Sequence, residues 1–265
     1  MLIKQKYGCT ALIAGASEGI GAAFAFCLAA EGMDLVIIAR RLPQLQLVAA
    51  RIESKYKVKV LCISCDLGSA DATQQILEAL NGKEIDLIVY NAAVSIIGPF
   101  LKNSAKDHNQ LARVNMITPL NMLHAFGQKM IERQRGAIIL MSSLAGFQGS
   151  GFLSVYAASK AFNRILAESL WYEWKEKGVD IIACCAGATS TENYKKTKPE
   201  KTGFFTPRVL TPGEVASECL GKLGKGPSFI AGRGNRLASF IMQKILPRKT
   251  AIKIMGDTTR KMYRI

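Results

Sequence analysis

The stretch TALIAGASEGIG, residues 10–21, decides the fold of this chain. Its first five residues are mostly apolar, as expected of a buried strand, and its three glycines stand directly before a helical pattern at residues 22–30. Glycine lets the backbone turn tightly and bring its N–H groups against a pyrophosphate, whose charge a helix N-terminus favours. Glycines also occur in plain tight turns, but between the first strand and the first helix they predict a dinucleotide-binding loop.

Apolar, β-branched runs alternate with longer helical patterns along the rest of the chain. Strands are expected at residues 10–14, 34–38, 58–63, 85–89, 137–141, 179–184 and 228–231, and helices at 22–30, 45–56, 71–80, 105–132, 155–177 and 212–223. Near-continuous apolar strands separated by helices indicate a parallel sheet covered on both faces. The predicted fold class is α/β: a doubly wound parallel sheet of the Rossmann type, in three α/β/α layers. A single domain is expected over residues 1–265, with ligands at the carboxyl ends of the strands.

Composition excludes several classes of protein. Of the 265 residues 49% are hydrophobic and 21% charged, as in ordinary globular proteins. No uninterrupted apolar run reaches the roughly 18 residues of a membrane-spanning helix, and the N-terminal apolar stretch runs into glycines and Glu18, which argues against a secretory signal. The seven cysteines form no disulfide framework, and Cys62 and Cys65 lack the further ligands of a metal site. We therefore expect no metal and a reducing cytoplasm.

The net charge of +15 has two concentrations, one at residues 195–201 and one at residues 244–265, where Asp257 is the single acidic residue. Nucleic acid is a conceivable partner of such charge, but no nucleic-acid-binding motif accompanies it, so none is expected. An anionic cofactor, an acidic substrate carrier, a membrane surface and a merely solvated basic surface all remain compatible with it.

The end of the second predicted strand distinguishes NADP from NAD. An acidic residue there would bind the adenosine ribose 2′-hydroxyl. This chain has Arg40 and Arg41 instead, whose guanidinium groups can bind a 2′-phosphate, so NADP(H) is preferred over NAD(H). Glu18 weakens the argument slightly, because it stands where a basic residue would have been a second phosphate ligand. Asp66, after the third strand, is expected at the adenine.

The segment YAASK, residues 156–160, carries the expected chemistry. Tyr156 and Lys160 are one helical turn apart and share a face if the segment is helical. A phenol titrates near pH 10 (roughly, in model peptides), and a neighbouring ammonium favours the phenolate. Tyr156 is thus a candidate general acid/base with Lys160 as its tuner. The alternative is a surface pair on an ordinary helix.

With these residues placed, the chain resembles the short-chain dehydrogenase/reductase family from about residue 8 to residue 191. The glycine loop is similar to the family's T-G-x-x-x-G-x-G, with Ala14 in place of threonine. Residues 91–93 are similar to its N-N-A-G segment, residues 142–146 to its serine motif, and residues 156–160 to its Y-x-x-x-K. Residues 186–191 resemble P-G-x-x-x-T with alanine in place of proline. Asn115 falls where the family keeps a catalytic asparagine.

The resemblance implies a mechanism. Tyr156 protonates the carbonyl oxygen in reduction or takes the hydroxyl proton in oxidation, and Ser143 hydrogen-bonds the same oxygen, as in an oxyanion hole. Ser142 competes for this role, but the thirteen-residue spacing to the tyrosine selects Ser143. Lys160 lowers the tyrosine pKa and holds the nicotinamide ribose, and Asn115 anchors a water of the proton relay. The expected cofactor-binding residues are Gly15, Ser17, Glu18, Gly19, Ile20, Gly21, Arg40, Arg41, Asp66, Leu67, Asn91, Ala92, Ala93, Tyr156, Lys160, Gly187, Thr189 and Thr191.

The resemblance implies that the segment after the sixth strand determines substrate specificity. Residues 192–212 are polar, lysine-rich and punctuated by prolines, so we expect a mobile loop, with Phe204, Phe205 and Pro207 as an apolar wall. Residues 235–265 are expected to be a basic amphipathic tail whose stripe includes Leu237 and Phe240. Such a tail either lies on an anionic membrane or, more often, covers the substrate pocket or a neighbouring subunit.

The sequence thus predicts an NADP(H)-dependent oxidoreductase that reduces a ketone or aldehyde, or oxidises the matching secondary alcohol. The similarity to 3-oxoacyl and 17β-hydroxysteroid reductases gives a lipid-like ketone an advantage, and a homodimer or homotetramer is what the resemblance implies. The alternative from a different class is a dinucleotide-binding regulator without turnover.

Overall fold

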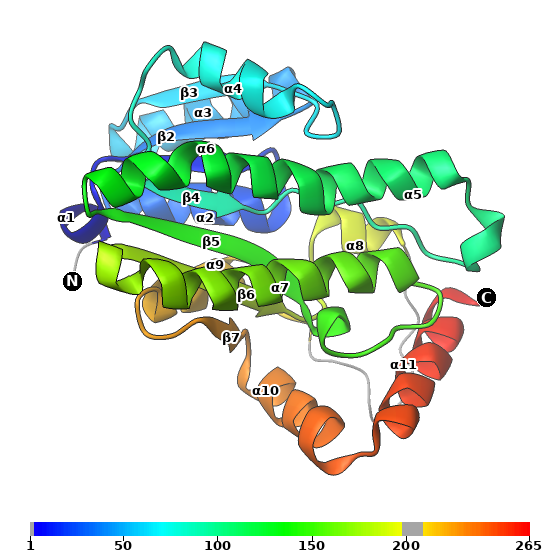
Figure 1. Ribbon diagram of the computed structural model, residues 1–265. Coiled ribbons are helices and arrows are strands. Elements are labelled where there is room, and N and C mark those ends of the chain that lie inside the picture. Colours follow the sequence, from blue (N-terminus) through cyan, green and yellow to red (C-terminus); the bar gives the residue numbers. More distant parts are fainter. Residues whose placement is uncertain (1–2, 198–208) are drawn as a thin grey trace.

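A seven-stranded parallel sheet forms the centre of the molecule, and the computed structural model describes residues 3–197 and 209–265 (Figure 1). The strands lie in the order β3-β2-β1-β4-β5-β6-β7. Their bounds are β1 (Thr10–Ala14), β2 (Asp34–Ala39), β3 (Val60–Ser64), β4 (Leu87–Tyr90), β5 (Gly136–Ser143), β6 (Val179–Ala186) and β7 (Ser228–Ile230). The order reverses between β1 and β4, so the doubly wound sheet is confirmed, with its switch point there.

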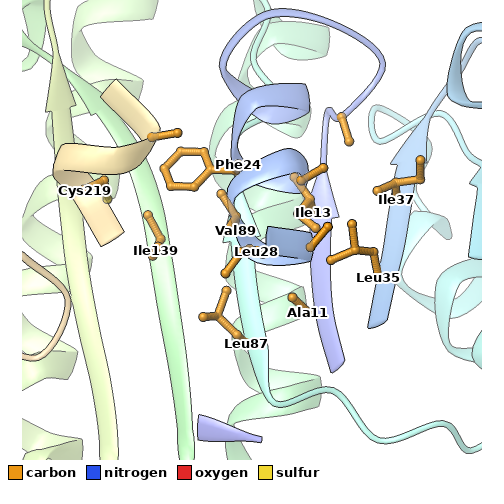
Figure 2. Close-up of a cluster of buried hydrophobic side chains, with 14 of the residues drawn as sticks. Ala11, Ile13, Phe24, Leu28, Leu35, Ile37, Leu87, Val89, Ile139 and Cys219 are labelled. Atoms are coloured by element: carbon orange, nitrogen blue, oxygen red, sulfur yellow. The ribbon is translucent and has the colours of Figure 1, made fainter. Parts of the chain in front are cut away.

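Helices cover both faces of the sheet, which confirms the three-layer prediction (Figure 1). One face packs against α2 (Gly19–Ala30), α3 (Leu42–Tyr56) and α9 (Pro212–Lys222). The opposite face packs against α4 (Ala72–Leu80), α6 (Thr118–Glu132) and α7 (Ser154–Trp174). Successive strand residues point to opposite faces, so Ile13 joins the first core and Leu12 the second. Figure 2 shows Phe24 and Leu28 of α2 against the first face.

The helix predicted over residues 105–132 is interrupted. It consists of α5 (Ala105–Ala112), the π-helical turn η2 (Arg113–Ile117) and α6. Similarly, α7 ends at Trp174 and a 3₁₀ turn, η4 (Lys175–Lys177), completes the predicted span. Two further 3₁₀ turns, η1 (Phe100–Lys102) and η3 (Leu144–Phe147), and the N-terminal helix α1 (Ile3–Tyr7) were not predicted. The Tyr7 hydroxyl holds α1 to the sheet by donating to Asp180 Oδ2 at 2.8 Å.

The prediction of a loop from residue 192 is wrong for its first part, because α8 (Glu192–Lys196) is helical. The Thr191 hydroxyl caps this helix by accepting the Tyr194 N–H at 3.1 Å, and Lys195 pairs with Glu192 at 2.8 Å. Such a cap satisfies an N–H group that the first helical turn leaves without a partner. The predicted apolar wall of Phe204, Phe205 and Pro207 lies outside the described residues.

The C-terminal segment forms a V-shaped pair of helices beyond β7 (Figure 1). Helix α10 (Arg233–Phe240) continues into a π-helical turn, η6 (Ile241–Ile245), and α11 (Arg248–Tyr263) returns toward the body. Three apolar side chains of this segment are exposed, namely Leu237, Phe240 and Ile245. The predicted apolar stripe therefore lies on the protein surface. In residues 3–197 and 209–265, no helix combines the length and apolarity needed to cross a bilayer.

Candidate active site

The glycine loop lies at the switch point of the sheet, and Gly15 and Gly21 have no room there for a side chain. Gly15 has φ +82°, and a Cβ on it would lie 2.7 Å from Ala92 Cα. A Cβ on Gly21 would overlap the Gly15 carbonyl oxygen. That oxygen accepts a hydrogen bond from Asn91 Nδ2 at 2.9 Å. The ends of β1 and β4 are therefore locked together, with Asn91 and Ala92 half-buried beside the loop.

The N-terminus of α2 fits the expected dinucleotide. Glu18 occupies the N-cap position, but its side chain makes no capping hydrogen bond. The first N–H groups of α2 therefore keep the capacity to bind an anion, which the helix dipole also favours. Gly19, at φ +60°, approaches Thr191 so closely that a Cβ would lie 2.9 Å from Thr191 Cγ2. The loops after β1 and β6 thus meet in front of the helix, and together they form a cradle at the N-terminus of α2.

The two arginines after β2 have different surroundings. Arg41 pairs with Glu18, with 3.0 Å between Nη2 and Oε2. Arg40 is exposed and takes part in none of the ion pairs found in residues 3–197 and 209–265. Asp66 is exposed and accepts the Gly68 N–H at 3.0 Å. The Leu67 carbonyl accepts the Thr118 hydroxyl at 2.7 Å. Arg40 is thus the more accessible cation at this edge.

Ser143 and Tyr156 meet at the end of β5. Tyr156 lies in the first turn of α7, partly buried, and its hydroxyl is hydrogen-bonded to Ser143. Burial raises the pKa of Tyr156, and the hydrogen bond to Ser143 opposes that rise. Ser142 is turned the other way and donates to the Lys160 carbonyl at 2.7 Å. The structure therefore brings Ser143, rather than Ser142, to the tyrosine.

Lys160 lies behind the Tyr156 ring. Its ammonium is 5.6 Å from the ring centroid and donates to the Met141 carbonyl at 2.9 Å. The residue is only 3% exposed, and this burial lowers the pKa of Lys160 to about 8. Among the effects on the pKa of Tyr156, burial is the largest, and a lowering of this pKa by Lys160 stays a prediction. At neutral pH the tyrosine therefore carries its proton, as a general acid must.

Asn115 is fully buried in the π-helical turn η2. Its Oδ1 accepts the Val94 N–H at 2.8 Å, and its Nδ2 donates to the Val94 carbonyl at 2.9 Å and to Ser159 Oγ at 3.0 Å. Ser159 Oγ in turn donates to the Tyr156 carbonyl at 2.8 Å. A polar chain thus connects the segment after β4 to the backbone of the tyrosine. Sequence reasoning missed Ser159, since a serine inside a helix carries no signal of such a contact.

The segment after β6 forms the wall of the cradle. Thr189 is buried and donates to the Gly187 carbonyl at 3.1 Å, and its backbone pairs with Leu210. A Cβ on Gly187 would lie 2.7 Å from Nδ2 of Asn235, a buried residue of α10. Sequence reasoning also missed Asn235. Ser17, Ile20 and Ala93 complete the predicted set, and of these Ala93 is exposed.

A second tyrosine, Tyr263 from the last turn of α11, lies near the site. It is half-buried and hydrogen-bonded to Thr197, just after α8. It is close enough to Tyr156 that its charge raises the pKa of Tyr156. Tyr263 stands outside every motif, because only the return of α11 to the body of the molecule brings it there.

Comparison with known proteins agrees with this geometry. The family model described as short chain dehydrogenase matches residues 9–202. A 7β-hydroxysteroid dehydrogenase from Clostridium sardiniense is 33% identical over 236 residues, which cover 89% of this chain and 90% of that protein. A very-long-chain 3-oxoacyl-CoA reductase-B from Danio rerio is 31% identical over 266 residues, which cover 98% of this chain and 84% of that protein.

Solved structures show the same similarity. A 7β-hydroxysteroid dehydrogenase structure has a TM-score of 0.91 at 30% identity, and the match covers 96% of this chain and 99% of that one. A short-chain dehydrogenase from Sphingobium yanoikuyae, in complex with NADPH, has a TM-score of 0.75 at 27% identity, over 84% and 87% of the two chains. Together with the matched family model, these relatives establish that the chain belongs to the short-chain dehydrogenase/reductase family and is an oxidoreductase acting on CH–OH and C=O groups.

Proposed function

We propose that this chain is an NADPH-dependent reductase of ketones or aldehydes, which also runs the reverse oxidation of secondary alcohols. The observation that carries the proposal is the hydrogen-bonded pair of Ser143 and Tyr156, with Lys160 behind it, at the carboxyl edge of the sheet that also holds the glycine loop. In a doubly wound sheet, ligands bind at this edge beside the switch point.

The proposed reaction uses each side chain for a separate task. When bound, the nicotinamide supplies the hydride. Tyr156 donates its proton to the carbonyl oxygen as the alkoxide forms, and its raised pKa keeps that proton available at neutral pH. Ser143 donates a hydrogen bond to the same oxygen and stabilises its developing negative charge. Lys160 provides a positive charge behind the tyrosine and holds the ribose hydroxyls.

We assign Asn115 a positioning role. The resemblance implied that it anchors a water, but both hydrogens of its Nδ2 are already donated to Val94 and Ser159. The amide therefore holds the backbone of Tyr156 in place through Ser159, and its Nδ2 has no hydrogen left to donate to a relay water. π-helical turns inside α-helices are frequent at functional sites.

The preference for NADPH is proposed from Arg40. It is exposed, carries no described ion pair, and follows β2, where an NAD-dependent relative would need a carboxylate. Arg41 is held by Glu18 and contributes less. The Sphingobium yanoikuyae relative in complex with NADPH supports the same choice. A guanidinium can bind a 2′-phosphate with two parallel hydrogen bonds.

For the substrate we propose a lipid-like ketone, such as a steroid ketone or a 3-oxoacyl thioester, as the names of the two curated relatives suggest. We propose one domain, in which residues 8–191 bind the cofactor and residues 192–212 and 235–265 shape the substrate side. A homodimer or homotetramer in a reducing cytoplasm completes the proposal, and the seven free cysteines suit that compartment.

Calorimetric titration with NADPH and with NADH tests the cofactor. We expect tighter binding of NADPH, and Arg40→Ala should weaken it about 10- to 100-fold, the value of a hydrogen bond to a charged group, while NADH binding stays unchanged. Glu18→Gln releases Arg41 and should tighten NADPH binding. Equal affinity of the wild type for both cofactors would contradict the preference.

Turnover tests the mechanism. Tyr156→Phe keeps the ring but has no proton to give, so we expect reduction of ketones to slow by at least about 10²-fold with NADPH binding intact. A wild type that binds NADPH but reduces neither steroid ketones nor 3-oxoacyl thioesters would contradict the proposal. It would favour a dinucleotide-binding regulator instead.

A further inference from the structure

The C-terminal helix α11 is anchored on the loop that leads from Ser143 to Tyr156. Gly151 lies so near the helix that a Cβ on it would stand 3.2 Å from Gly256 Cα. A Cβ on Gly149 would stand 3.5 Å from the side chain of Ile252. The Arg260 guanidinium lies 5.3 Å from the centroid of the Phe152 ring, a cation–π contact. The direction of α11 is thereby fixed over about two turns.

The last turn of α11 reaches the opposite side of the site. Tyr263 is hydrogen-bonded to Thr197, which follows α8, and Tyr194 of α8 lies near enough for Tyr263 to act on its pKa. Thr191, the N-cap of α8, is also the residue that approaches the glycine loop at Gly19. Helix α11 therefore bridges the loop before Tyr156 and the helix beside the cradle, and its end comes back to the body of the molecule (Figure 1).

This position brings the aromatic side chain of Tyr263, one turn after Arg260 on α11, close to Tyr156. Tyr263 lies close enough to Tyr156 to raise its pKa, and Tyr263 itself is half-buried. An aromatic ring at such a place offers a flat apolar surface with a polar end, which suits a flat apolar molecule better than a small polar one.

We propose that Tyr263 is a substrate-contacting residue whose ring, with that of Tyr194, forms the wall facing Tyr156 and selects ketones with a broad apolar body. The inference rests on the proposed function and names the substrate feature that this site reads. It assigns specificity to the far end of the chain, 107 residues after the catalytic tyrosine in sequence.

The test compares Tyr263→Ala and Tyr263→Phe with Tyr172→Ala, which removes an exposed tyrosine from α7 and serves as the matched control. The KM of each protein is measured for a steroid ketone and for cyclohexanone, with NADPH as the reductant. We expect Tyr263→Ala to raise KM for the steroid ketone at least tenfold and to leave KM for cyclohexanone within twofold. Tyr263→Phe keeps the ring and should retain KM, and the control should match the wild type. Equal effects on both ketones, or none, overturn the proposal.

Binding separates this inference from the proposed function. The dissociation constant of the steroid ketone is measured by equilibrium dialysis on NADP⁺-saturated protein, where no turnover is needed. If Tyr263→Ala binds the steroid ketone more weakly than the wild type does, the proposed wall is supported. If the wild type then reduces no ketone, the proposed reductase activity alone is contradicted. Wild-type binding that Tyr263→Ala leaves unchanged, or no binding to the wild type, contradicts the wall.

Discussion

The side chain of Lys160 is buried, and burying its charged ammonium group opposes folding. Burial lowers the pKa of Lys160 from 10.5 to about 8. At about 1.4 kcal/mol for each pH unit, the charged side chain destabilises the folded state by about 3 kcal/mol at neutral pH. Below pH 8 Lys160 is protonated in both the folded and the unfolded state, so the full destabilisation is present. Between pH 8 and pH 10.5 only the unfolded chain keeps it, so the cost disappears as the pH rises.

We therefore expect Lys160→Met to be more stable than the wild type at pH 7 by about 1–3 kcal/mol, reduced by the lost hydrogen bond to Met141, and to lose turnover. Urea unfolding at pH 7 and at pH 10.5 measures the difference, which should vanish at the higher pH. Lys83→Met, at an exposed position, is the control and should change stability little. A variant less stable than the wild type at pH 7 would show that Lys160 supports the fold.

Among single residues, the sequence predicted that three side chains of the candidate site lie close together. Tyr156, Ser143 and Lys160 meet as their spacing indicated, because a helical turn and a strand end are local structures. Ser159 and Tyr263 could not be predicted, because each reaches the site through contacts between distant segments. The ion pair of Glu18 with Arg41 was not predicted either, although both residues had been assigned to the cofactor site.

At the scale of elements, the π-helical turn η2 depends on its link to α7. Ser159→Ala removes the acceptor of the Asn115 Nδ2 hydrogen and the donor to the Tyr156 carbonyl. Because a buried polar group is then left unpaired, we expect a loss of about 1–3 kcal/mol in the free energy of unfolding, and slower turnover with unchanged KM for NADPH. Ser169→Ala, which removes a hydroxyl bonded to Ile165 on the exposed side of α7, is the control. Equal effects of the two changes would contradict the positioning role.

Two helical glycines make a second matched pair. A Cβ on Gly21 in α2 would overlap the Gly15 carbonyl, whereas a Cβ on Gly221 in α9 would meet nothing within 4 Å. Gly21→Ala should therefore displace the loop and abolish dinucleotide binding. Gly221→Ala should stabilise the protein by about 1 kcal/mol through helix propensity. Thermal unfolding with and without NADPH measures both. Retained NADPH binding in Gly21→Ala would show that the loop tolerates displacement.

The elements themselves were predicted where a repeating pattern defines them. The first strand was predicted to the residue, and β5 and β6 were found longer than expected at the site edge. The extra residue of a π-helical turn leaves no mark in composition, so η2 was taken as ordinary helix. Helix α8 carried a usable signal in Thr191 and the Glu192–Lys195 pair, but the lysines and prolines around it favoured a loop.

For the whole molecule, the net charge of +15 should act on the encounter with an anionic cofactor. Long-range attraction raises association rates and is screened by salt. We expect the association rate of NADPH to fall roughly tenfold between low salt and 0.5 M salt, as followed by stopped-flow fluorescence. Raising viscosity with sucrose instead of salt is the control, because it slows diffusion without screening charge. An association rate independent of salt would mean that the basic residues face away from the site.

The overall architecture followed from the alternation of strands and helices, while the course of the tail did not. Its apolar stripe was predicted, yet the pattern alone gives no direction, and the return of α11 to residues 149–152 depends on Gly151 and Gly256 fitting together.

The place of β4 beside β1 also bears on how the protein is made. During synthesis β1 and β2 can pair as soon as about 40 residues have emerged, but the other edge of β1 waits for residues 87–90. Until then that edge presents unpaired N–H and C=O groups, which attract other chains. The close contact between Gly15 and Ala92 also forms only at that point. A dinucleotide therefore cannot stabilise the nascent chain before residue 92 has emerged, and a chaperone that covers the open edge of β1 would protect the chain until then.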